Sequence, residues 1–233
     1  MIWLGIETAN APLSVALVKD GKVVAEVVQQ IKLTHSAGAM PAIEELFAKV
    51  SMSPKDIDAI AVSEGPGSYT GVRIGVTLAK TLAWTLQKPL VGVSSLQILA
   101  ANARLFHGVI CPLFDARRQN VYAAAYRGQT LETVISDTHD HIDGLLEKLK
   151  ALGEPVLFIG EDVSIFEEQI REALGDQALF APFTHQLPRA SECIALAATK
   201  ELPSIEATHT FIPQYRRLAE AEANWIKEQK ERA

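Results

Sequence analysis

The sequence predicts an α/β protein of two tandem domains that share one order of helices and strands. The chain has 233 residues, 48% of them hydrophobic, which is enough for one large core or two smaller ones. Three strand-like runs open the chain and are followed by alternating helical and strand patterns. The same order begins again near residue 109, without obvious sequence identity between the two halves.

The first 28 residues alternate apolar runs with turn signals, and the runs are residues 2–6, 13–18 and 23–28. Asp20 and Gly21 separate the second and third runs, and an Asp-Gly pair in this position is a strong hairpin signal. These residues predict three antiparallel strands. The elements expected next are a helix at 35–50, a strand at 57–62, a loop at 65–71, a helix at 72–86, a strand at 90–93 and a helix at 95–105.

The second half repeats this order. The expected elements are strands at 109–114, 121–126 and 133–136, a helix at 141–152, a strand at 156–159, a helix at 165–174, a strand at 178–180, and helices at 191–202 and 217–230. Three antiparallel strands followed by parallel αβ units form the ribonuclease-H-like layout, and two copies in tandem give the actin-like, sugar-kinase-like (ASKHA) architecture. We therefore expect closely apposed domains at 1–105 and 106–216, and a closing helix at 217–233.

The composition argues against a chain that binds RNA by itself. Residues 1–103 contain 8 basic and 8 acidic residues and the remainder contains 14 and 20, so the whole net charge of −6 lies after residue 103. No basic stripe stands out, and binding to a phosphate backbone relies on clustered Lys and Arg. Cys111 and Cys193 lie in apolar surroundings without CxxC spacing. Two buried thiols are expected, and a disulfide or a metal pair is the alternative.

Targeting signals are not evident in the sequence. The N-terminus reaches Glu7 too soon for a signal peptide, and no apolar run approaches the roughly 20 residues of a membrane helix. A soluble, cytoplasmic protein is expected. P-loop and GxSxG motifs are absent. HExxH and HxxxH motifs are also absent, so no zinc pair lies on one helix face and no metal site is expected. His139 and His141 are expected in a solvated loop, and His35 either begins a helix or contacts a partner.

The elements that bind ATP in most actin-like proteins are degraded here. Such proteins hold the phosphates on two hairpins and the adenosine on a Gly-Gly pair, because a Cβ would block close approach of the backbone. The first hairpin, residues 7–13, has no glycine and carries Glu7 where such sites usually carry Asp. The second, residues 115–119, also lacks glycine and begins with Asp115. We expect Glu7 and Asp115 to be remnants of a nucleotide site, and no cofactor.

The most distinctive segment is the loop before the helix at 72–86. It consists of Gly65, Pro66, Gly67, Ser68, Tyr69, Thr70 and Gly71. The glycines allow a tight turn, and Ser68 or Thr70 can cap the helix. Such a helix start can bind an anion or can serve only as a structural cap, and the sequence favours neither.

The helix at 72–86 is apolar nearly all round, which is typical of a helix buried on more than one side. Gly71, Gly75, Ala79 and Ala83 recur every fourth residue and would let another helix approach closely. Either the chain's own fold covers this helix, or its outer side contacts a partner protein. In the second case the helix at 35–50 extends the patch, and both helices could join two helices of the partner.

These motifs resemble the TsaB (YeaZ) family of tRNA threonylcarbamoyladenosine (t6A) biosynthesis proteins. The resemblance spans the chain, is most specific before residue 126, and is carried by residues 6–8, 35–41, 65–83, 93–96, 115–122 and 213–220. It implies a non-catalytic paralogue of TsaD, the subunit that transfers threonylcarbamoyl to the adenosine beside the anticodon. It also implies a heterodimer with TsaD through the two N-terminal-domain helices, a homodimer through the same surface, docking of the P-loop ATPase TsaE, and contact with tRNA only through the complex.

The resemblance and the helix-face geometry together select the expected contact residues, which are Met40, Ile43, Phe47, Arg73, Val76, Lys80 and Trp84. A charge at Val76 or Ala79 would then break association without unfolding the chain. Two alternatives remain beside this scaffold function. One is an actin-like ATPase or small-molecule kinase, which the fold alone supports. The other is a peptidase acting on TsaD, for which Ser68 is the nucleophile candidate, although no His or Asp is linked to it in sequence.

Overall fold

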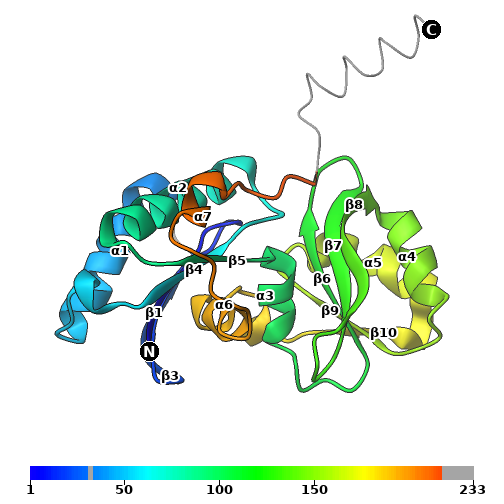
Figure 1. The fold of residues 1–233 in the computed structure, drawn as a ribbon. Coiled ribbons are helices and arrows are strands. Elements are labelled where there is room, and N and C mark those ends of the chain that lie inside the picture. The colour runs from blue at the N-terminus through cyan, green and yellow to red at the C-terminus, as the bar shows by residue number, and fades with distance from the viewer. Residues whose placement is uncertain (31–33, 217–233) are drawn as a thin grey trace, which may run out of the picture.

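The structure is a computed structural model that describes residues 1–30 and 34–216. These residues form two five-stranded mixed sheets with helices on both faces of each (Figure 1). The helix expected at 217–230 lies outside the described residues. Among the helices of the described ranges, none has both the length and the apolar character that are needed to cross a bilayer.

The first sheet has the strand order β3-β2-β1-β4-β5, in which the first three strands are antiparallel and the last two are parallel to β1. Its strands are β1 (Ile2–Glu7), β2 (Leu13–Lys19), β3 (Lys22–Gln29), β4 (Ala59–Ser63) and β5 (Leu90–Val93). The expected Asp-Gly hairpin joins β2 and β3, and both of its residues have positive φ.

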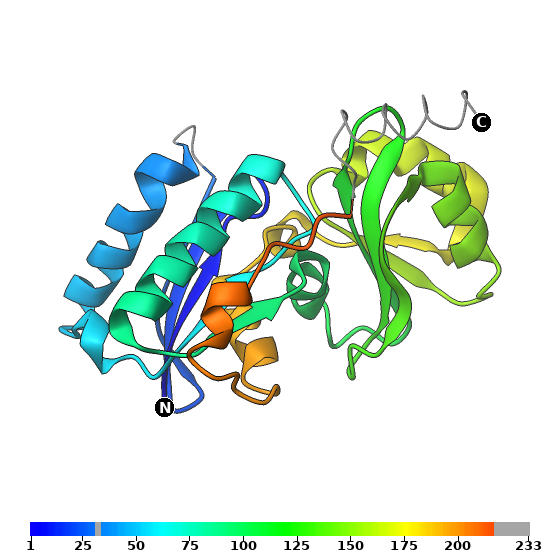
Figure 2. The same cartoon turned by 45° about the horizontal axis from the view of Figure 1, so that its top comes forward.

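Helices α1 (His35–Lys49) and α2 (Tyr69–Leu86) lie side by side on one face of the first sheet (Figure 2). A 3₁₀ turn, η1 (Pro54–Asp56), precedes β4. The apolar faces of α1 and α2 enclose the first core together with the sheet, and this core includes Leu4, Ile6 and Ile60. Helix α2 ends at Gln87, whose left-handed conformation lets its N–H reach the last carbonyls of the helix.

The second sheet repeats this topology with the order β8-β7-β6-β9-β10. Its elements are β6 (Val109–Asp115), β7 (Asn120–Arg127), β8 (Thr133–His141), α4 (Ile142–Lys150), β9 (Val156–Ile159), α5 (Val163–Leu174), η2 (Gly175–Gln177) and β10 (Ala178–Phe180). Helices α4 and α5 cover the outer face of this sheet (Figure 1). The repeat confirms the predicted tandem ribonuclease-H-like, ASKHA architecture.

The two halves exchange one helix each. Helix α3 (Ser95–Ala101) follows the first sheet in sequence but packs on the second, where Leu96 and Leu99 join a core with β6 and β7. Helix α6 (Ala190–Ala197) follows the second sheet but packs on the first, where Cys193 and Ile194 are buried against β1 and β2. Both helices lie between the sheets (Figure 1). Each exchanged helix therefore packs on the sheet that it does not follow in sequence.

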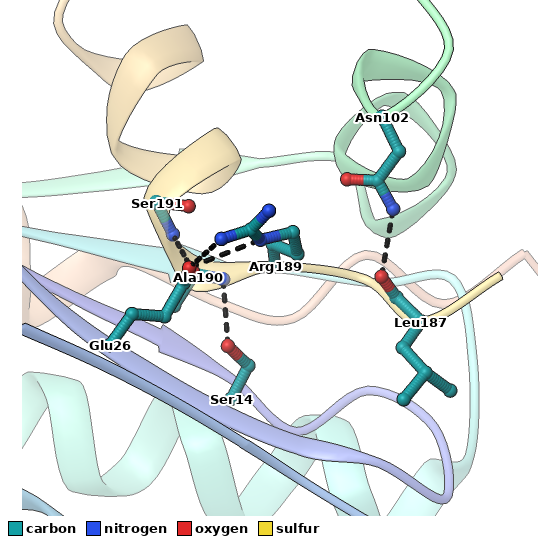
Figure 3. A network of polar contacts seen from close by, with 7 residues as sticks. All are labelled: Ser14, Glu26, Asn102, Leu187, Arg189, Ala190 and Ser191. Atoms are coloured by element: carbon teal, nitrogen blue, oxygen red, sulfur yellow. Dashed lines mark hydrogen bonds and ion pairs between the residues drawn. The ribbon is translucent and has the colours of Figure 1, made fainter. Parts of the chain in front are cut away.

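Polar contacts fix α6 to the first half, as Figure 3 shows. The Glu26 carboxylate on β3 accepts hydrogen bonds from the Arg189 side chain and, at 2.9 Å, from the Ser191 N–H at the start of α6. The Ala190 N–H donates to Ser14 Oγ on β2 at 2.9 Å. At the other exchanged helix, Asn102 donates to the carbonyl of Leu187 at 2.8 Å. These contacts hold the two halves in close apposition.

Several local expectations need correction and one is confirmed. Helix α2 begins at Tyr69, three residues before the expected start, and α3 ends at Ala101, four residues before the expected end. Strand β8 extends to His141, so His139 lies in a strand, and the His141 ring accepts the N–H of Asp143 as the N-cap of α4. Helix α6 ends at Ala197, five residues before the expected end. A 3₁₀ turn, η3 (Phe183–His185), lies before the start of this helix. Cys111 and Cys193 are both buried and free, as predicted, and burial raises the pKa of both thiols.

Candidate protein-interaction site

The row of small residues on α2 packs against the chain's own first strand. A Cβ at Gly71 would overlap the Thr8 carbonyl oxygen, and a Cβ at Gly75 would overlap Thr8 Oγ1. The Thr8 hydroxyl also donates to the Gly71 carbonyl at 2.9 Å. Ala79 and Ala83 continue the same row and are completely buried. The row therefore brings α2 close to the chain's own backbone after β1, and of the two alternatives for this row the geometry favours coverage by the chain's own fold.

The glycine-rich loop fixes the start of α2 on the first hairpin. The Ser68 N–H donates to the Ala9 carbonyl at 2.7 Å, and Ser68 Oγ accepts the N–H of Gly71 at 3.3 Å. A Cβ at Gly67 would overlap the Ala9 carbonyl oxygen, which explains the glycine there. Of the two interpretations of this loop, the geometry favours the structural cap. Within the described residues, Ser68 Oγ has no hydrogen bond to a His or Asp side chain.

Three of the seven expected contact residues belong to the core. Ile43, Phe47 and Val76 are 1%, 4% and 2% exposed, because α1 and α2 turn these side chains toward the sheet. The expectation that they contact a partner is therefore corrected. A charge at Val76 or at the neighbouring Ala79 would disrupt the core, so these positions cannot test association.

The other four expected residues reach the surface. Arg73 and Trp84 are exposed on α2, and Met40 on α1 and Lys80 on α2 are half-buried. Between them, the outermost strip of α2 carries small polar side chains. It consists of Thr70, Thr77, Thr81 and Thr85, all of which are exposed. In the sequence, Thr77, Thr81 and Thr85 only interrupt an apolar helix, and Thr70 is a candidate cap.

A C-terminal segment, residues 206–216, lies along α2 on the side opposite α1, and we call it the C-terminal strap (Figure 2). It contains the short helix α7 (Ala207–Thr210). Lys80 Nζ donates to the carbonyls of His209 at 3.2 Å and of Phe211 at 2.7 Å. The rings of Trp84 and His209 lie 4.2 Å apart between centroids.

Near the start of α2 the strap forms an aromatic clamp, which consists of Tyr69, Arg73 and Tyr215. Arg73 Nε donates to the Tyr215 hydroxyl at 2.7 Å, and its guanidinium lies 4.0 Å from the ring centroid of Tyr69. The two tyrosine rings are 5.3 Å apart. The hydrogen bond to Tyr215 raises the pKa of the Arg73 guanidinium. Sequence reasoning missed the clamp because its parts lie 142 residues apart.

Glu7 is completely buried at the end of β1, under the hairpin that would hold phosphate. Burial raises the pKa of its carboxyl to about 7, and hydrogen bonds from Ser63 and from the Ala9 N–H oppose this shift. The Ala9 N–H donates to Glu7 Oε1 at 2.6 Å. Both backbone groups of Ala9 thus already form hydrogen bonds within the chain. The N–H donates to Glu7, and the carbonyl accepts the N–H of Ser68.

Asp115 stands at the end of β6, in the equivalent hairpin of the second half. The Asp115 carboxylate accepts the backbone N–H of Arg117 at 2.8 Å, and the backbone N–H of Asp115 donates to the Asp162 carboxylate at 2.8 Å. The turn that follows has positive φ at Arg117, Arg118 and Gln119, where a phosphate-binding turn would use glycine. Within the described residues, no group of three or more His, Cys, Asp or Glu side chains could hold a metal ion.

Comparisons with known proteins place these features in a family. A family model described as "TsaD: tRNA N6-adenosine threonylcarbamoyltransferase" matches residues 22–225. The tRNA threonylcarbamoyladenosine biosynthesis protein TsaB of Bacillus subtilis is 46% identical over 232 residues, which are 99% of this chain and 100% of that protein. The tRNA N6-adenosine threonylcarbamoyltransferase of the same organism is 32% identical over 168 residues, which are 61% of this chain and 49% of that protein.

The solved structure of YeaZ from Pseudomonas aeruginosa matches with a TM-score of 0.73 and 26% identity, over 92% of this chain and 99% of that chain. The match to the transferase covers about half of that longer protein, whereas the matches to TsaB and YeaZ run over nearly the full length of both chains. The chain therefore belongs to the TsaB (YeaZ) family of tRNA threonylcarbamoyladenosine biosynthesis proteins.

Proposed function

We propose that this chain is a non-catalytic accessory subunit of the complex that transfers threonylcarbamoyl to the adenosine beside the anticodon of tRNA. It binds the transferase TsaD through the outer faces of α1 and α2, and the ATPase TsaE docks on the pair. The chain contacts tRNA only as part of this complex. In the absence of TsaD, the same face supports a homodimer.

The observation that carries this proposal is the exposed strip of α2. The strip presents small threonines between larger exposed side chains, which include Arg73 and Trp84. Small residues allow a partner's helix to approach closely, and Trp and Arg are enriched at the centres of protein interfaces. Helix α1 runs beside this strip, so two helices present one continuous face (Figure 2).

The hairpins support a role without nucleotide chemistry. In the first half, the glycine-rich loop that other proteins could use for phosphate is packed on Ala9. In the second half, the Asp115 N–H donates to the Asp162 carboxylate at 2.8 Å, and the carboxylates of both residues would repel a phosphate. The catalytic groups and the nucleotide are therefore assigned to TsaD and TsaE.

The test is a double substitution on the exposed strip, Thr77→Glu with Thr81→Glu. Both side chains are exposed, so the monomer should fold normally, and two carboxylates in a close helix–helix interface should weaken binding to TsaD at least about tenfold. Titration calorimetry with purified TsaD measures the affinity, and light scattering measures loss of the homodimer.

Ile165→Glu provides the matched control, because Ile165 is an exposed helical residue of α5 on the second half. This variant should bind TsaD with the same affinity as the wild type. Unchanged affinity in the Thr77→Glu, Thr81→Glu variant would show that TsaD does not use this face.

A further inference from the structure

The C-terminal strap crosses the free edge of the first sheet to reach α2. Phe211 packs against the first core, and a Cβ at Gly92 on β5 would overlap the Glu64 carboxylate and lie 2.7 Å from the Phe211 ring. Gly92 therefore leaves the space through which the strap passes the edge strand. Beyond this point the Gln214 N–H donates to the Glu64 carbonyl at 2.7 Å. A half-buried anchor at Phe211 thus precedes a more exposed end, residues 212–216.

Four of the twelve exposed large hydrophobic side chains of the described residues lie on α2 and the strap. Ile212 is 67% exposed, Tyr69 55%, Trp84 49% and Tyr215 44%. Three of these four are aromatic, and Arg73 lies between the two tyrosines. Tyrosine, tryptophan and arginine are the residues that most often dominate the energy of protein interfaces. The strap thus extends the exposed strip of α2 with side chains suited to a partner protein.

The contacts of the strap also order the side chains of α2. Arg73, Lys80 and Trp84 are each held by a strap residue, so less conformational entropy would be lost when a partner binds them. Within the described residues, Arg73 and Lys80 contact rings, a hydroxyl and carbonyls, and neither forms an ion pair with a carboxylate. Their positive charges are therefore not neutralised by a carboxylate of the described residues, which favours acidic side chains on a partner.

We propose that the C-terminal strap is part of the surface that docks TsaD, with Ile212 and Tyr215 in direct contact with it. Acidic side chains of TsaD then face Arg73 and Lys80. This inference rests on the proposed function, and it adds the strap to the docking face beside helices α1 and α2. The strap forms one side of that face and α1 forms the other, with α2 between them (Figure 2).

Two single substitutions on the full chain test this proposal, Ile212→Ser and Tyr215→Ala. Each should weaken binding to TsaD about tenfold, measured by titration calorimetry. Neither residue is buried, so the melting temperature should stay close to that of the wild type. Phe183→Ser is the matched control, because Phe183 is an exposed apolar residue of the second half that is 82% exposed, and its affinity should not change.

Each outcome identifies what has failed. If both strap variants bind TsaD as tightly as the wild type, the strap is not part of the docking surface. The same conclusion follows if they bind more tightly, because the strap would then compete with TsaD for α2. If the strap variants bind normally while Thr77→Glu with Thr81→Glu weakens binding, only this inference fails. If the wild-type chain does not bind TsaD at all, the proposed function fails and the inference fails with it.

Discussion

Gly71→Ala is expected to destabilise the chain by roughly 3 kcal/mol or more, since overpacking here would displace backbone. The new Cβ would overlap the carbonyl oxygen of Thr8, the residue directly after β1, and neither backbone segment can move freely. The Thr8 hydroxyl donates a hydrogen bond to the Gly71 carbonyl, and this hydrogen bond would break when the new side chain pushes α2 outward. Thermal and urea unfolding, followed by circular dichroism, measure the effect.

Gly144→Ala is the matched control for this change, because Gly144 also lies inside a helix, α4. There the nearest atom to a new Cβ is a carboxylate oxygen of Asp140 at 3.3 Å, which belongs to a side chain that can adjust. This variant should be neutral or more stable by about 0.5–1 kcal/mol. Equal and small effects at both positions would mean that α2 does not pack on β1 through its glycines.

The second large effect is a loss of stability with rising pH caused by Glu7. Its pKa is raised from 4.5 to about 7 in the folded chain, so the folded state binds a proton that the unfolded state has released. The resulting stabilisation is fully present below pH 4.5 and is lost as the pH rises through 7. The free energy of unfolding should therefore fall by roughly 3 kcal/mol between pH 4.5 and 8.

Glu7→Gln should remove this contribution and make the chain more stable than the wild type at pH 8. The amide oxygen of glutamine can still accept the Ala9 N–H, so the hairpin keeps its hydrogen bond. Urea unfolding at several pH values measures the slope. Burial also raises the pKa of Glu64, so this carboxyl likewise makes the free energy of unfolding fall as the pH rises. The comparison should therefore be repeated in a Glu64→Gln background. An unchanged pH slope in Glu7→Gln would show that Glu7 is ionised in the folded state.

The order of elements could be predicted from the sequence because each element carries a local signal. Period-2 and period-3.6 patterns, the Asp-Gly turn at 20–21 and the Ser68 cap each depend on a few neighbouring residues. The repeated order then indicates the tandem fold. The exchange of α3 and α6 has no such signal, because it depends on which sheet each apolar helix finally covers.

The contact residues were predicted only in part for a related reason. An apolar helix shows its buried residues clearly, but periodicity does not show whether a buried residue faces the chain's own sheet or a partner. Ile43, Phe47 and Val76 were therefore assigned to the interface although they form the core. The strap was missed as well, since Tyr215 meets Arg73 only after the chain has crossed the edge of the sheet.

The most direct test of a binding subunit without chemistry of its own is reconstitution of t6A formation with purified TsaD, TsaE and variants of this chain. We predict that Glu7→Gln and Asp115→Asn support the wild-type rate, because neither carboxylate takes part in the reaction. We predict that Thr77→Glu with Thr81→Glu supports little or none, because TsaD is not bound. Loss of t6A formation with the two carboxylate variants, and normal formation with the threonine variant, would contradict both parts of the proposal.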